Sequence, residues 1–161
     1  MGLKRISAPP AGLRVTATVQ RVGKLKKVSA RDTNAAGADL RITLTGGTVK
    51  TRVRAGFVVS LNTKPGEEGT AQLIDETMGS PPVPARKSRN TYVFEPVQFE
   101  EPGPTASRVF RITNVRANVS GLSSGSASAT PVVASISISG ITGISLVHAE
   151  QDIASVEPAA R

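Results

Sequence analysis

The sequence predicts an all-β protein, an antiparallel β-sandwich of the jelly-roll or immunoglobulin-like kind with about ten short strands and no substantial helix. Apolar and polar residues alternate with period two in several short runs, which is the pattern of half-buried strands. The 15 glycines and 11 prolines punctuate those runs, as in proteins built from strands and turns. Aromatic residues are scarce, so Val, Ile, Leu and Ala must form the core, which suits sheet packing.

The 161 residues are most simply one domain, long enough to bury a sizeable core. Residues 1–12 are basic and contain Pro9-Pro10, and we interpret them as an extended N-terminal arm of the kind that packs on a neighbouring subunit. Residues 13–158 then form the single β-sandwich domain, and residues 159–161 form a C-terminal tail.

The first half of the chain is expected to contain a hairpin. Residues 13–22 alternate strictly as the first strand, and the polar residues 23–39 connect it to the next strand at 40–45. Gly46-Gly47 supplies the positive φ angles of a tight turn, so residues 48–54 should return beside 40–45. The strands expected after this hairpin are separated by turn sequences and cover residues 56–62, 69–75, 91–99, 108–119, 132–139, 144–148 and 151–156.

The strongest strand pattern is RVFRITNVRANV, residues 108–119. Phe110 and Ile112 share one face, but after Asn114 the apolar residues move to the odd-numbered positions. A one-residue change of phase within a single run predicts a β-bulge or a strand that crosses between sheets.

The last long strand, residues 132–139, has an uncharged outer face. The even-numbered residues are apolar and point inward, whereas Val133 and three serines point outward. A flat Ser-rich face tolerates contact with another sheet or a neighbouring subunit. Residues 120–130, which precede this strand, are almost entirely Ser, Gly, Ala and Thr and are expected to form a flexible or closely packed loop.

The net charge of +8 is unevenly distributed. Residues 1–54 contain 12 Lys and Arg and two acids, whereas residues 55–161 contain eight Lys and Arg and ten acids. Such polarity attracts an anionic polymer or helps identical subunits to meet head to tail, and the alternative is a solvated basic face. The residues expected to contact a polymer or a subunit are Lys24, Lys26, Lys27, Arg41, Lys50, Arg52 and Arg54, of which the last four should form one basic stripe on the predicted hairpin.

No motif in the sequence predicts a catalytic, cofactor or metal site. His148 is the only histidine, no G-x-S-x-G motif is present, and an ordinary surface or turn histidine is the expected role. The acidic pairs Asp75-Glu76 and Glu100-Glu101 could hold a calcium ion with carbonyl oxygens, but no calcium-loop spacing is present and solvated carboxylates are the simpler interpretation.

The composition gives few limits on the cellular compartment. There are no cysteines, which excludes disulfides and thiolate metal sites. No apolar run approaches the roughly 20 residues that span a bilayer. Residues 1–7 begin like a signal peptide but lack the apolar segment that should follow, so we expect a soluble chain or a mature form whose export signal is missing.

The order of several strand motifs resembles the N-terminal β-rich region of large, uncharacterised secreted bacterial surface proteins. The resemblance covers residues 40–158 and implies an extracellular, surface or filamentous location, but it carries over no functional residue. Its motifs are TGGT at 45–48, VVSLNT at 58–63, AQLIDE at 71–76, RVFRITNVRANVSGL at 108–122 and VVASISISG at 132–140.

Together these features favour a non-enzymatic, self-associating structural β-domain with no cofactor, which forms a homo-oligomer, filament or shell in an extracellular filament, a surface layer or a virion. The arm and the edge strands would make the subunit contacts. The alternative is a binding module for an anionic polymer, either nucleic acid or envelope polysaccharide, through a basic sheet face.

Overall fold

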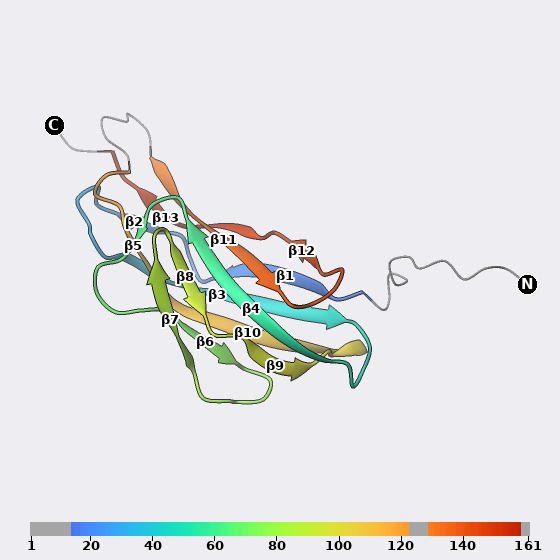
Figure 1. Cartoon of the computed structure of the whole chain (residues 1–161). Helices are drawn as coiled ribbons and strands as arrows, with labels where there is room; N and C mark the ends of the chain where they lie inside the picture. Colours follow the sequence, from blue (N-terminus) through green and yellow to red (C-terminus); the bar gives the residue numbers. More distant parts are fainter. Residues whose placement is uncertain (1–13, 123–128, 159–161) are drawn as a thin grey trace, which may run out of the picture.

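The computed structural model describes residues 14–122 and 129–158, which form an all-β structure without a helix (Figure 1). The predicted arm at 1–12, the tail at 159–161 and most of the predicted loop at 120–130 lie outside the described residues. The strands are β1 Thr16–Val22, β2 Lys26–Val28, β3 Ala35–Gly46, β4 Arg52–Leu61, β5 Lys64–Pro65, β6 Gln72–Asp75, β7 Val83–Ser88, β8 Thr91–Phe94, β9 Val97–Glu100, β10 Gly103–Asn118, β11 Thr130–Ser139, β12 Ser145–Val147 and β13 Glu150–Val156.

All the strands belong to one hydrogen-bonded sheet that curls into a half-barrel. Its order is β12-β1-β3-β10-β6-β7-β8-β4-β11-β13-β2, with β5 beside β10 and β9 beside β4. The pairs are antiparallel except at the two ends of the path, where β12 and β2 pair in parallel. The predicted antiparallel all-β class is therefore confirmed, but the sheet is continuous because β7 pairs with β6 on one side and with β8 on the other.

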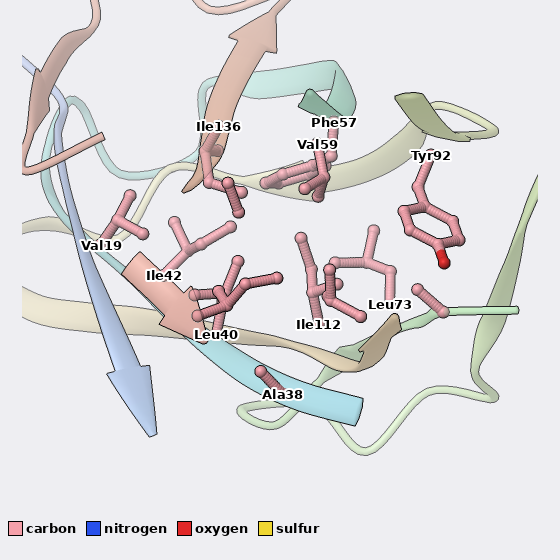
Figure 2. Packing of buried hydrophobic residues seen from close by; sticks show 14 of the residues in the cluster. Val19, Ala38, Leu40, Ile42, Phe57, Val59, Leu73, Tyr92, Ile112 and Ile136 are labelled. Atoms are coloured by element: carbon pink, nitrogen blue, oxygen red, sulfur yellow. The ribbon is translucent and has the colours of Figure 1, made fainter. Parts of the chain in front are cut away.

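The core lies between two walls of the curled sheet. Figure 2 shows Phe57, Val59 and Ile136 from β4 and β11 facing Leu40, Ile42 and Ile112 from β3 and β10. At one end of this core the Phe110 ring packs between Phe57 and Phe99, with ring centroids 5.0 Å apart in each pair. The alternation predicted from the sequence thus places the apolar side chains on the enclosed face.

Side chains close the seam between β1 and β13, where no backbone ladder forms. The Gln151 amide donates to the carbonyl of Val19 (3.1 Å), and its oxygen accepts from the backbone N–H of Arg21 (3.1 Å). The Arg21 guanidinium in turn donates to the carbonyl of Asp152 (2.8 Å). These contacts satisfy backbone groups that a free sheet edge would expose.

The predicted hairpin between residues 40–45 and 48–54 is wrong. Strand β3 pairs with β1 and β10, and β4 pairs with β8, β9 and β11. Gly46 and Gly47 do have positive φ angles (83° and 84°), but they carry the chain from one wall to the other. Residues 52–54 of the predicted return strand and the predicted strand 56–62 instead join in β4, because the apolar phase continues through Ala55 into the buried Phe57.

The phase change in β10 is confirmed as a bulge. The register with β3 shifts between Ile112 and Val115 and again before Arg116, and Asn114 has a φ of 59°. The extra residue keeps Ile112 and Val115 on the same enclosed face, so the strand does not cross between sheets. The bulge lies opposite the start of β3, a segment that the sequence had suggested was a turn.

Candidate interaction surface

The seven basic residues predicted as a contact surface do not lie together. Lys24, Lys26 and Lys27 are exposed on and beside β2, at one end of the sheet path, where the Lys26 ammonium donates to the carbonyl of Ala36 (2.7 Å). Three lysines within four residues make this short edge strand the most basic edge of the sheet.

The expected stripe of Arg41 with Lys50, Arg52 and Arg54 is not formed, because the hairpin that would assemble it is absent. Arg41 lies on β3 and Arg52 on β4, in different walls. In register, Arg52 lies opposite Glu100 of β9, and Arg54 lies opposite Gln98. Lys50 belongs to the crossing segment between β3 and β4 and has a φ of 75°.

Arginine–carboxylate pairs account for two of the four acids, Asp75 and Glu76, that the sequence offered as a calcium site. Arg108 contacts Asp75 (2.9 Å), and Glu76 lies 3.7 Å from Arg111 and 3.9 Å from Arg41. Glu101 accepts a hydrogen bond from the backbone N–H of Thr48 (2.9 Å). Within the described ranges, no three His, Cys, Asp or Glu side chains gather as a metal site would require.

His148 lies in the turn between β12 and β13, with an exposed side chain and a φ of 57°. Its backbone carbonyl accepts from the Gln151 amide (2.9 Å). In the part of the chain that the structure describes, its imidazole makes no hydrogen bond. The histidine thus lies in an exposed turn.

Tyr92 joins the two walls beside the bulge. Its hydroxyl donates to the carbonyl of Arg116 (2.7 Å) and accepts from the backbone N–H of the same residue (3.3 Å). The Arg116 guanidinium continues the network to Asn114 Oδ1 (2.7 Å) and to the carbonyl of Asn34 (3.0 Å). Burial raises the pKa of Tyr92, against the smaller opposing effects of hydrogen bonds with the Arg116 and Gly66 backbones and of the Arg116 charge.

We expect Tyr92 to make the fold sensitive to alkaline pH. Because the folded pKa lies above the unfolded value of about 10, the tyrosine's contribution to stability is complete below that pH and is lost as the pH rises through the folded pKa. Urea unfolding at a series of pH values should show this loss in the wild type and a shallower loss in Tyr92→Phe. Tyr92→Phe should also cost about 1–3 kcal/mol at neutral pH, because the backbone N–H of Arg116 loses its partner and the Arg116 carbonyl keeps only the N–H of Gly66. If the free energy of unfolding falls equally steeply with rising pH in the wild type and in Tyr92→Phe, Tyr92 does not cause the alkaline sensitivity.

Part of the outer surface of the second wall is an uncharged face. It covers β8, β4 and β11, whose outward residues alternate with buried ones. The registers align these outward residues in rows across the three strands, for example Val93, Val58 and Ser137. The uncharged face consists of Gly56, Val58, Ser60, Thr91, Val93, Ser135, Ser137 and Ser139.

Opposite charges flank the uncharged face. On one side, β7 places the exposed Arg86 beside Val93. On the other side, β13 places the exposed Glu150 beside Ser135 and Asp152 beside Val133. The alternation of residues 132–139 predicted the serines of this face. The flanking charges lie on strands that are distant in sequence, so they can be identified only once the strand order is known.

Two adjoining hollows open on the side of the molecule between the β6–β7 connection and β9. The inner chamber has a volume of about 190 Å³ and is lined by Leu73, Asp75, Ser80, Pro81, Val83, Val97, Gln98 and Phe110. The outer cleft has a volume of about 350 Å³ and is lined by Arg52, Asp75, Met78, Ser80, Gln98, Phe99, Glu100 and Arg108. No sequence motif pointed to these hollows.

Comparison with known proteins finds no matching family model and no matching curated protein. The resemblance to bacterial surface proteins therefore remains a prediction. Within residues 14–122 and 129–158, no helix has the length and apolar character needed to cross a membrane.

Proposed function

We propose that this chain is a non-enzymatic structural subunit that associates with copies of itself, as subunits of extracellular filaments, surface layers and virions do. The observation that carries the proposal is the uncharged face between Arg86 and the acids Glu150 and Asp152. Small side chains at its centre let a second sheet approach closely without burying an unpaired charge. The flanking charges add a preferred orientation for the partner.

A second copy fits this face when the two chains are related by a two-fold axis parallel to the strands. That rotation places β13 of one copy over β7 of the other, because the strand order across the face is β7-β8-β4-β11-β13. Glu150 then lies near Arg86 of the partner, and the same pair forms twice by symmetry. An axis perpendicular to the strands would instead bring the two acidic flanks together.

The two edges of the sheet are poorly suited to pairing with another subunit, which agrees with contact through the uncharged face. The path ends in β12 and β2, each only three residues long, and β2 carries two exposed lysines. Short and charged edges oppose the addition of a neighbour's strand. Subunit contact therefore falls on the face rather than on the edge strands.

The contact is expected to be weak when it acts alone. Together with the flanking strands β7 and β13, the contact surface covers five strands about 4.8 Å apart. With about five residues of 3.3 Å from each strand, its area is on the order of 400 Å². A stable interface buries about 800 Å² per partner. A lasting assembly therefore needs repetition or a second contact, which raises the effective concentration of the first.

A charge exchange across the face tests the proposal. Arg86→Glu and Glu150→Lys should each weaken self-association several-fold in sedimentation velocity at low salt, and the double variant should recover it, because the pair is restored with reversed sign. Ser137→Lys should weaken it by about tenfold or more, which corresponds to 1.4 kcal/mol, because the ammonium becomes buried without a partner. Thr45→Lys, on an exposed position of the opposite wall, is the matched control. A wild type that stays monomeric at high concentration and forms no particles or filaments in electron micrographs would falsify the proposal.

A second candidate function is binding of an anionic polymer, favoured by the exposed lysine cluster at β2. Here Lys24, Lys26 and Lys27 would contact phosphate or sulfate groups without Arg41, Arg52 and Arg54. Retention on heparin that falls steeply with salt supports this function, and salt-insensitive behaviour opposes it.

A further inference from the structure

The inner chamber has apolar residues on part of its lining and room for one side chain of moderate size. Its floor is formed by Leu73 and Phe110, each 1% exposed, and its sides by Val83 and Val97. A volume of about 190 Å³ is well below the 300 Å³ or more of most cofactor pockets. An apolar cavity of about 150 Å³ already admits a benzene-sized group, so a single Leu or Ile side chain fits here.

The outer cleft supplies polar groups for contact with the rest of the segment whose side chain enters the inner chamber. Asp75, Ser80 and Gln98 line both hollows and so lie where they join. Arg108 stacks on the Phe99 ring at 5.0 Å and contacts Asp75, while its buried Nε has no hydrogen-bond partner among the described residues. Glu100 is exposed and makes no ion pair within 4.0 Å in the described part of the chain. This combination suits an extended peptide that has an apolar side chain and a nearby cation.

The N-terminal segment of this chain has that chemistry. Residues 1–8 read MGLKRISA, in which Lys4 and Ile6 are two positions apart. In an extended chain such residues point to the same side, about 7 Å apart. With Ile6 in the chamber, the Lys4 ammonium can reach the carboxylate of Glu100.

The described chain begins close to the mouth of the cleft. A Cβ atom on Gly47 would touch both Val15 and Glu101, and Glu101 follows the cleft residue Glu100. Arg14 lies eight positions after Ile6, a span of about 26 Å in an extended chain. The sequence Pro9-Pro10 within this spacer favours an extended conformation.

We propose that the N-terminal segment of one copy docks into the two hollows of a second copy, with Ile6 in the inner chamber and Lys4 beside Glu100. The inference rests on the proposed self-association and supplies the second contact that the small uncharged face needs. It does not require the face, because the hollows and the uncharged face have no residue in common.

A complementation experiment on full-length chains tests whether the N-terminal segment of one copy docks into the hollows of another. Ser80→Trp fills the mouth but leaves the donor segment intact, and Ile6→Asp disables the donor but leaves the hollows open. In a background of Ser137→Lys, which removes the face contact, neither variant should associate alone, whereas their mixture should form a one-to-one heterodimer in sedimentation velocity. Gln98→Trp, at a second exposed position shared by both hollows, should behave like Ser80→Trp. Far-UV circular dichroism confirms that each variant is folded. A mixture that remains monomeric overturns the inference.

Direct binding gives an independent readout. A peptide of residues 1–12, labelled at its C-terminus, should bind full-length Ile6→Asp in fluorescence anisotropy and shift the methyl resonances of Leu73, Val83 and Val97. An Ile6→Asp peptide should bind at least about tenfold more weakly, because burying an Ile side chain contributes about 1.5–3 kcal/mol. A peptide of reversed sequence controls for charge alone, and equal binding by it overturns the inference. If Ser137→Lys abolishes association while Ser80→Trp leaves it unchanged, the docking segment is wrong and the proposed function stands.

Discussion

Phe110→Ala is expected to destabilise the protein by about 3–5 kcal/mol, the largest effect of any single change considered for this chain. The Phe110 side chain is 1% exposed and packs against both Phe57 and Phe99. These are three of the four phenylalanines in the sequence, so the cluster holds most of the phenylalanine rings available to the core. A cavity would remain beside the inner chamber, which Phe110 also lines.

Chemical denaturation with guanidinium chloride measures this effect, and the thermal midpoint should fall by roughly 6–20 °C for a chain of this size. Val109→Ala is the matched control, because the neighbouring residue of the same strand lies on the half-buried outer side. Phe110→Leu should cost less than Phe110→Ala, since it leaves a smaller cavity. A loss below 1 kcal/mol for Phe110→Ala would mean that the three rings do not form the packed cluster seen at this end of the core.

The local features of the fold could be predicted from the sequence because side-chain alternation is a local property. The even-numbered residues of 132–139 are buried as expected, and the change of phase after Asn114 corresponds to the bulge in β10. Both conclusions need only the rule that side chains alternate along a strand. Neither conclusion depends on which strands are neighbours.

The pairing of strands could not be predicted in the same way. Gly46-Gly47 favours a two-residue hairpin locally, yet a Cβ atom on Gly46 would collide with the carbonyl oxygen of Arg14, which lies just before β1. These glycines therefore serve a close approach between distant segments, and β4 pairs with β11, about 75 residues later in the sequence. The same limit applies to the candidate surfaces. Arg86 and Glu150 flank one face, and Leu73 and Phe110 line one chamber, only because of the strand order.

Asp39→Ala is expected to destabilise the protein by about 3 kcal/mol, because one carboxylate holds the bulge in β10 from the neighbouring strand. Asp39 accepts from the Arg111 guanidinium (2.8 and 3.0 Å) and from the backbone N–H of Asn114 (3.1 Å). Asn114 has a φ of 59°, a conformation that costs free energy for a residue other than glycine. Hydrogen bonds to a charged group contribute about 1.5–3 kcal/mol each, and removing the acceptor leaves the Asn114 N–H without a partner.

A comparison of single variants in urea unfolding separates the two contributions of Asp39. Arg111→Met removes the ion pair with Asp39, together with the longer contact to Glu76, and should cost about 1 kcal/mol, because both the Arg111 and Asp39 side chains are partly exposed and solvent screens their attraction. Asp39→Asn keeps an oxygen for the Asn114 N–H and should fall between Arg111→Met and Asp39→Ala. If Asp39→Ala costs no more than Arg111→Met, the carboxylate acts only as a surface ion pair. A larger loss places the stabilisation at the bulge, where one shifted residue keeps Ile112 and Val115 on the same side of the core.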